Sequence, residues 1–404
     1  MAPIPLDVLD YWRVNSYGYP NPFSGDVKSQ EAWVTFESFY DRDGMSYSDL
    51  KGYWGSSSAP RRLDPHAVES WKATFEEFGL LYVISRSNAV TVTPGGHQIY
   101  QAAKALNREA FVWIGLNLLF RYPVQGPPRG GRRSVAHRSA DVLPYRFLFS
   151  AMRDLGDYFW WTELERILCR VFSTSQAKRA VAAVGALRMD TSLLKTFELP
   201  VENRKGGFYN SLNQIANHAG LNHLVLRQDD TSEHYGPTES RRRHFIDREL
   251  LPLVSAALGD RTTLSDCAAS ALYVDRLPTA PTFTDEQAYF QYLGATVPTL
   301  AGVAAASAPQ ILDLAGDKVL LLKIGEHVER GEQAGNQVSV RGRLWVLCQV
   351  ARGQRVILST DTRWSYLVLT KDLINSDTVE VSLRKARPIT NIRLIEELFG
   401  GEDA

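Results

Sequence analysis

The chain has 404 residues, more than one hydrophobic core normally organises, so we expect two to four domains. Apolar residues make up 44% and charged residues 22%, which excludes a disordered chain. Its 45 basic and 45 acidic residues balance, so net charge predicts no partner and any affinity for nucleic acid must come from local patches.

The cysteines, the N-terminus and the apolar runs place the chain in a broad class. Cys169, Cys267 and Cys348 are far apart in apolar runs, so neither a disulfide framework nor a zinc site is expected. The N-terminus lacks the basic and apolar regions of a signal peptide. The longest apolar run, residues 110–120, falls short of the roughly 20 residues of a membrane helix. We expect a cytoplasmic protein without a metal or cofactor.

Two short helices are predicted after an irregular arm formed by the first 30 residues. Residues 30–40 carry apolar side chains at helical spacing, and a second short helix follows Ser46. The next segment, residues 64–79, gives the clearest local signal. Asp64 is a good helix cap, Pro65 suits the first helical turn, and Gly79 suits the helix end. The apolar stripe between them consists of Val68, Trp71, Phe75 and Phe78.

A change to a period of two after Gly79 predicts a β-hairpin over residues 81–92, followed by Pro94-Gly95-Gly96 and another helix. This order of helices and hairpin over residues 30–106 resembles a winged helix, which implies a fold but not a function. The outward face of the 64–78 helix is acidic and would repel phosphates, so the helix is not an obvious major-groove reader. That face carries Glu69, Lys72, Glu76 and Glu77.

Residues 121–146 have the composition of a linker, with several prolines and glycines and one acid, Asp141. Flexible arginine-rich arms pair with phosphates and enter narrow minor grooves, so this segment is the best candidate for DNA contact. The alternative is a solvated interdomain linker. The arginines of the segment are Arg121, Arg129, Arg132, Arg133, Arg138 and Arg146.

A second helix-turn-helix pattern follows the linker. Helices are predicted at residues 143–159 and 162–172, and the turn 173–175 can cap a third helix. The third helix has an apolar inner face, and its outer face suits DNA better than that of the 64–78 helix. The outer face is predicted to carry Gln176, Lys178, Arg179 and Arg188.

A further helix is predicted over residues 240–258, kinked or divided by Pro252. It places Arg241, Arg242 and Arg243 in its first turn, where cations oppose the helix dipole unless a phosphate binds. Pairing with nearby acids is the alternative, and these acids are Glu233, Glu239, Asp247 and Glu249.

Half of the eight histidines fall within a short region, at His218, His223, His234 and His244. A metal site or a general base can be built from such residues, although their spacing matches no zinc motif. A metal-dependent nuclease using His223, His234 and Asp230 is therefore an alternative function. The chain contains no phosphate-binding loop, nucleophile elbow or His-Glu-x-x-His helix.

The C-terminal region is predicted to be a small β-domain. Residues 278–315 are a second linker region, and strands are expected at 319–324, 337–350, 354–359, 365–370 and 378–383, with a closing helix at 391–399. Its aromatic and arginine side chains can stack bases or lie partly buried in strands.

We therefore expect an α+β multidomain protein, with tandem winged-helix or helix-turn-helix modules before a small antiparallel sheet or barrel. The predicted domains are residues 1–120, 147–277 and 316–404. In outline the chain is similar to DNA-binding components of bacterial restriction and phage-defence systems. That resemblance implies a non-enzymatic protein that binds double-stranded DNA through arginine–phosphate contacts, with a nuclease or ATPase partner subunit. A winged-helix protein-interaction or regulatory subunit is a further alternative.

Overall fold

A computed structural model describes most of the first 300 residues and eight short strands beyond them. The described ranges are 9–15, 17–24, 27–55, 65–83, 88–128, 134–204, 206–229, 233–259, 273–300 and the strands between 310 and 389. The chain divides into two compact units. Residues 1–21, 31–100 and 112–302 form unit 1, and residues 22–30, 101–111 and 303–404 form unit 2.

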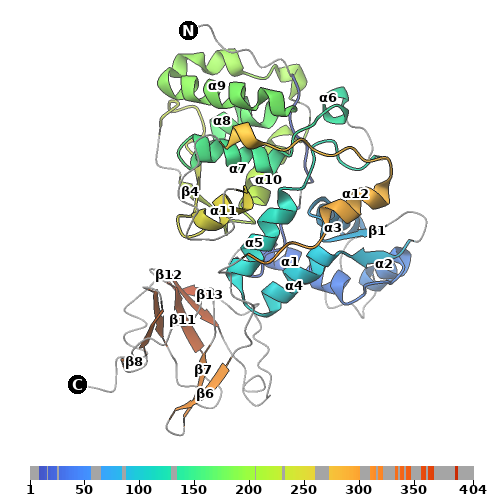
Figure 1. Ribbon diagram of the computed structural model, residues 1–404, viewed down its shortest axis with the longest axis vertical. Helices are drawn as coiled ribbons and strands as arrows, with labels where there is room; N and C mark the ends of the chain where they lie inside the picture. The colour runs from blue at the N-terminus through green and yellow to red at the C-terminus, as the bar shows by residue number, and fades with distance from the viewer. Residues whose placement is uncertain are drawn as a thin grey trace. The chain divides into compact units, whose positions relative to one another are not determined.

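The N-terminal part of the chain is a group of helices with one β-hairpin (Figure 1). The elements are α1 (Val27–Tyr40), α2 (Tyr47–Gly55), α3 (Pro65–Glu77), β1 (Leu81–Val83), β2 (Val90–Val92), α4 (Pro94–Lys104) and α5 (Arg108–Leu119). The hairpin is antiparallel, with Leu81 opposite Val92 and Val83 opposite Val90. These elements confirm the predicted helices and hairpin.

The segment before α2 pairs with one strand of this hairpin, a contact that the sequence did not indicate. The N–H of Gly44 donates to the carbonyl of Val90 at 2.8 Å, and the N–H of Val90 donates to the carbonyl of Met45 at 2.9 Å. An antiparallel bridge joins Ser46 to Ala89.

Aromatic rings fill the core between α1, α2 and α3. The ring centroids of Phe36 and Phe75 are 5.5 Å apart, and those of Phe39 and Trp54 are 4.5 Å apart. Helix α3 ends where predicted, because Gly79 has a φ of +67° and an added Cβ would lie 2.8 Å from the backbone of Leu293.

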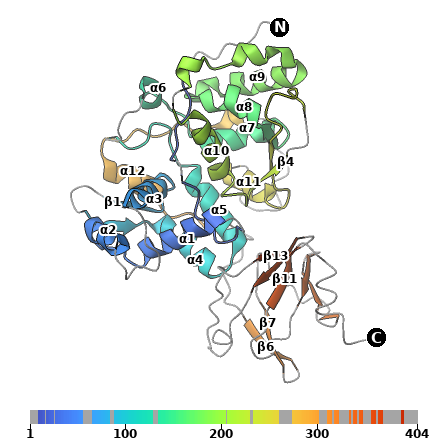
Figure 2. The same ribbon diagram turned by 180° about the vertical axis from the view of Figure 1, so that it is seen from behind.

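The middle of the chain combines helices with a three-stranded antiparallel sheet in the order β3-β5-β4. Its helices are α6 (Val135–Arg138), α7 (Pro144–Asp154), α8 (Trp161–Arg166), α9 (Ala177–Met189), α10 (Phe208–Ala219), α11 (Leu251–Ala257) and α12 (Glu286–Leu293). Its strands are β3 (Tyr158–Trp160), β4 (Leu226–Asp229) and β5 (Arg243–Ile246). Figure 2 shows α7, α8 and α10 grouped beside α9 within unit 1.

Two helix predictions in this part were wrong. The helix expected over 143–159 ends at Asp154, and Tyr158–Trp160 forms β3 instead. The helix expected over 240–258 is divided into β5 and α11, because β3 and β4 supply hydrogen-bond partners on both sides of β5. Pro252 lies in the first turn of α11, where its missing N–H costs nothing.

Many of the described residues of segment 121–146 are packed in unit 1, although the composition of the segment is that of a linker. Tyr122, Val124 and Val142 are buried. Asp141 accepts a backbone hydrogen bond from Ala280 at 2.7 Å. Apolar side chains between the prolines and arginines therefore anchor this segment inside unit 1.

An extended N-terminal arm, residues 9–15 and 17–21, crosses unit 1. Trp12 donates its indole N–H to the carbonyl of Val171 at 2.7 Å. Further along, the N–H of Asn15 donates to Glu77 of α3 at 3.0 Å, and Tyr19 contacts the turn after α10 through Asn222. The arm thus holds α3 and α10 together.

The described part of the C-terminal region consists of antiparallel strands, as predicted. They are β6 (Gln310–Leu314), β7 (Asp317–Leu321), β8 (Gln333–Ala334), β9 (Gln337–Val340), β10 (Arg343–Val346), β11 (Val356–Thr360), β12 (Arg363–Leu367) and β13 (Arg387–Ile389). They form sheets in the orders β6-β7, β10-β9-β8 and β11-β12-β13. The strand expected over 337–350 is instead a pair, β9 and β10, with Val340 opposite Arg343. The predicted strand 378–383 and helix 391–399 lie outside the described residues.

The described structure is therefore a mixed α+β protein with small antiparallel sheets. Within these residues, no helix combines the length and the apolar character needed to cross a membrane.

Candidate nucleic-acid interface

Helix α9 continues from a capped 3-10 turn, Thr174–Gln176. The side chain of Ser173 accepts the N–H of Ser175 at 3.3 Å, and Gln176 accepts the N–H of Ser173 at 3.2 Å. Asp141 accepts the N–H of Thr174 at 2.7 Å. These bonds satisfy several of the free N–H groups at the helix start, which fixes where α9 begins. The predicted capping turn at residues 173–175 is confirmed.

The inner face of α9 consists of small apolar side chains and one long polar side chain, that of Arg188. Ala180, Ala183, Val184 and Leu187 are buried. Arg188 also turns inward, contrary to the prediction that it faces solvent. Its guanidinium donates to the carbonyl of Leu155 at 2.5 Å and to that of Tyr158 at 3.0 Å.

The guanidinium of Arg188 forms an ion pair with Glu163, whose carboxylate on α8 is fully buried. Its Nε and Nη2 donate to the two Glu163 oxygens at 2.6 and 2.9 Å. The hydroxyl of Tyr235 and the N–H of Trp160 donate to the same carboxylate at 2.6 and 2.9 Å. A buried ion pair with its oxygens so fully bonded holds α9 against α8 and β3.

The outer face of α9 is exposed and contains no acid. The helix sequence has no Asp or Glu, and Lys178, Arg179, Ala182 and Met189 are exposed. Lys178 lies 2.6 Å from Asp275, yet 67% of its side chain is exposed. The helix lies at the edge of unit 1 in both ribbon views (Figures 1 and 2). This face therefore carries two exposed cations, one of which pairs with Asp275.

The three consecutive arginines lie on and before β5 rather than at a helix start. Arg241 forms an ion pair with Glu233, as the pairing alternative predicted. The guanidinium of Arg242 lies 4.0 Å from the ring centroid of Trp161. Arg243 lies 2.5 Å from Asp229. Strand geometry sends Arg242 and Arg243 to opposite faces, so the three do not form one phosphate site.

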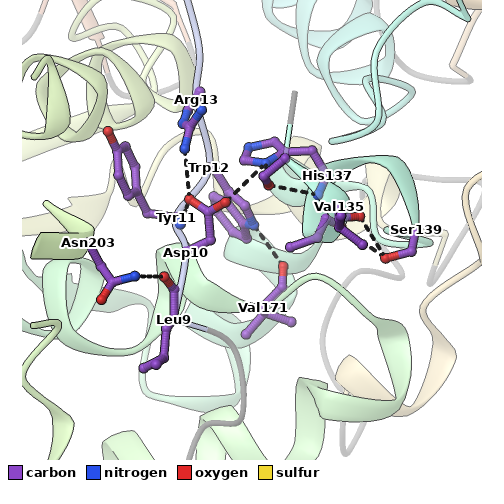
Figure 3. A network of polar contacts seen from close by, with 12 residues as sticks. Leu9, Asp10, Tyr11, Trp12, Arg13, Val135, His137, Ser139, Val171 and Asn203 are labelled. Carbon is purple, nitrogen blue, oxygen red and sulfur yellow. Dashed lines mark hydrogen bonds and ion pairs between the residues drawn. The ribbon is translucent and has the colours of Figure 1, made fainter. Parts of the chain in front are cut away.

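Of the predicted arginine-rich arm, Arg138 is described and exposed, whereas Arg129, Arg132 and Arg133 lie outside the described residues. Arg138 ends α6, which His137 anchors to the N-terminal arm (Figure 3). The Nδ1 atom of buried His137 lies 2.7 Å from the Ser134 hydroxyl and 3.6 Å from Asp10.

Burial disfavours the ionised form of Asp10, but hydrogen bonds from His137, Ser134 and the N–H of Tyr11 outweigh it, together with the charge of Arg13. These contacts hold the pKa of Asp10 well below its ordinary value. The Ser134 hydroxyl and Asp10 both approach Nδ1, whereas a catalytic triad requires them on opposite ring nitrogens. The contact is therefore an anchor for α6.

The histidines are separated from one another. His218 lies buried between α10 and the arm, 2.7 Å from the Tyr17 carbonyl and 2.9 Å from the Tyr145 hydroxyl. His234 stacks on Trp160, His244 is buried against Phe159, and His223 is exposed. Asp230 lies outside the described residues. Among the side chains that are described, no three His, Cys, Asp or Glu residues are grouped to hold a metal ion.

The outward face of α3 is less acidic than its sequence indicated. Glu77 is buried against Asn15, and Glu76 accepts the N–H of Val83 at 3.0 Å and pairs with Lys72 at 2.8 Å. Glu69 is exposed and paired with Lys51. The acids of α3 thus stabilise neighbouring segments, and the face is close to neutral.

Sequence reasoning missed Glu163, which carries most of the polar anchoring of α9. Its partners Arg188 and Tyr235 are distant in the chain, so no local spacing indicates the contact. No protein-family model matches the chain, and no curated protein matches its sequence.

Proposed function

We propose that this chain is a non-enzymatic DNA-binding protein that contacts duplex DNA through α9. The observation that supports this most directly is the outward face of α9, which is exposed and cationic and carries no acid of its own. A helix of this kind fits the width of a B-DNA major groove.

The order of side chains along α9 supports this role. Lys178 and Arg179 lie at its N-terminal end, where cations meet the phosphates at a groove edge. Ala182, one turn further along, allows the backbone to approach base edges closely. Arg188 and the cap at Ser173 fix the helix rigidly, which lowers the entropic cost of binding.

The N-terminal module supports a winged-helix assignment as part of the same proposal. Helices α1 to α3 precede the β1–β2 hairpin, and the segment before α2 pairs with β2. Because the face of α3 is nearly neutral, we assign this module to a protein contact rather than to the DNA. A partner subunit with nuclease or ATPase activity, in a cytoplasmic bacterial defence or restriction complex, is the setting that the sequence resemblance favours.

A binding experiment tests the role of α9. The purified chain is titrated into labelled duplex DNA across a salt series, beside the double substitution K178E/R179E. We expect the substitution to weaken binding at least tenfold and to flatten the salt dependence, because two phosphate contacts are lost. The matched control is R248E, which reverses an exposed cation outside α9. Equal weakening by the control, or binding insensitive to salt, would contradict the proposal.

The same experiment with Mn²⁺ or Mg²⁺ tests the alternative function. Metal-dependent cleavage that disappears on substituting His223, His234 or Asp230 would establish a nuclease instead. If no DNA shift is seen at any salt concentration, the protein-interaction alternative is favoured.

A further inference from the structure

The inner face of the β3-β5-β4 sheet contains a buried histidine. His244 lies on the central strand β5, opposite Phe159 of β3 and Gln228 of β4. Its ring stacks on Phe159 with centroids 5.0 Å apart and planes 17° apart, and the residue is only 6% exposed. Its Nδ1 atom is buried and has no hydrogen-bond partner among the described residues. The imidazole is thus packed as a neutral ring.

Among the described residues, the groups that act on this ring include no acid that would stabilise a positive charge. Phe159 of β3, Trp161 of α8 and Gln228 of β4 are uncharged neighbours. The charged or titratable groups that act on it are Arg242, directly before β5, and His223, before β4. Burial first, and then these two groups, lower the pKa of His244 to about 4 from 6.5.

The sheet around His244 is small enough to open by itself. Strand β5 pairs with three residues of β3 and four of β4. The turn before β4 is already strained, because Leu221, Asn222 and His223 all have positive φ, between 44° and 68°. Opening β5 breaks these two short ladders and the backbone hydrogen bonds that extend them, from Trp161 to Arg242, from Ile246 to Asp157 and from Asp247 to Val225.

We propose that His244 makes the β3-β5-β4 sheet an acid-sensitive element of the fold. When the imidazole takes up a proton, β5 separates from its neighbours and the ring reaches solvent, while the N-terminal module stays folded. Opening frees Arg242 from Trp161 and Arg243 from Asp229, so acid changes the cationic surface of this region. The proposal does not depend on DNA binding.

Hydrogen exchange of the full chain, followed by mass spectrometry at pH 7.5, 6 and 5, tests it. After correction for intrinsic exchange rates, the opening constant of the β5 peptide should rise roughly 30-fold at pH 5, given a pKa of about 4 in the sheet against 6.5 in solvent. A peptide from α3 should change far less.

Matched substitutions identify the titrating group. H244F keeps the stacked ring but cannot be protonated, so acid should no longer open β5. H234F is the control, since His234 is exposed and stacks on Trp160, and the acid response should persist. If H244F fails to fold, H244Q replaces it as a neutral polar residue. The proposal is overturned if H244F or H244Q keeps the acid response, or if β5 and α3 lose protection together in the wild type.

Discussion

Helices α3 and α9 are both 13 residues long and each comes after a shorter helix in the chain, yet they present different surfaces. On α3, Glu76 and Glu77 bond the hairpin and the arm, and Glu69 pairs with Lys51. On α9, Lys178 and Arg179 are exposed and the helix itself contains no acid, although Asp275 pairs with Lys178. The place of a helix in a helix-turn-helix pattern therefore does not decide its surface. Its neighbours in the fold decide which charges remain outside.

The two helices are also anchored by different forces. Trp71, Phe75 and Phe78 place α3 in an aromatic core, so its position depends on apolar burial. The buried side chains of α9 are mainly alanine and valine, and Arg188 with Glu163 adds a polar anchor. The stability of the α9 region should therefore be far more sensitive to the loss of one charge.

Substitution R188A should give the largest effect. It leaves the Glu163 carboxylate buried without its cation, which should cost about 3–5 kcal/mol of unfolding free energy. Urea denaturation followed by tryptophan fluorescence measures this. The double substitution E163Q/R188M, which removes both charges, should recover part of the loss. A loss below about 1 kcal/mol in R188A would show that the pair is not a stabilising anchor.

At low pH, protonation of His218 should destabilise the contact between the arm and α10. The loss of unfolding free energy should be similar to that caused by R188A. The Tyr17 carbonyl only accepts, so Nε2 of His218 carries a proton, and in the neutral ring Nδ1 accepts from the Tyr145 hydroxyl. Burial lowers the pKa of His218 to about 4 from 6.5. The unfolded chain therefore binds the proton more tightly, and stability falls as pH drops from 6.5 toward 4.

The expected loss from His218 is about 3 kcal/mol by pH 4. Unfolding free energies in urea at pH 7.5, 6 and 5 should show its onset. The substitution H218Q, whose amide can donate to Tyr17 and accept from Tyr145, should flatten the slope. H223Q replaces an exposed histidine and should leave the slope unchanged. A slope unaltered by H218Q would contradict this assignment.

A smaller effect is expected from Asn222, which joins the arm to the strained turn. Its amide accepts the N–H of Tyr19 at 3.2 Å and donates to the Tyr19 carbonyl at 2.7 Å, with its own φ at 51°. N222A should cost about 2 kcal/mol, from two unsatisfied backbone groups and a disfavoured left-handed conformation. N222G removes the backbone strain but not the loss of the two hydrogen bonds, so its stability should lie between that of N222A and that of the wild type. Equal stability of N222A and wild type would show that the arm is not held by this contact.

Much of the N-terminal module could be predicted because its signals are local. The stripe from Val68 to Phe78 and the left-handed Gly79 are properties of adjacent residues, and the fold keeps them. The capped start of α9 was predictable for the same reason.

The errors arose where distant partners decide the structure. Ser240 and the apolar spacing from Ile246 to Leu253 imitate a helix, but pairing with β3 and β4 makes Arg243–Ile246 a strand. On a helical projection Arg188 lies within the apolar stripe, one turn after Val184, but its charge led to a solvent-facing prediction because its distant partner Glu163 was not indicated by the local sequence. Alternation through residues 338–346 continues across Arg341-Gly342, so it could not distinguish one strand from the hairpin β9–β10.

The smallest effect should come from the surface pair of α3. Lys51 and Glu69 form an ion pair, but their side chains are 32% and 53% exposed. Solvent screens such pairs, so K51A should change stability by no more than about 1 kcal/mol. The same substitution exposes an uncompensated acid on α3. If the α3 module contacts protein rather than DNA, K51A should leave DNA affinity within about twofold of wild type, whereas α3 in a groove would lose affinity several-fold from the repelled phosphates. Measured beside K178E/R179E, K51A therefore decides which of the two helices faces the DNA.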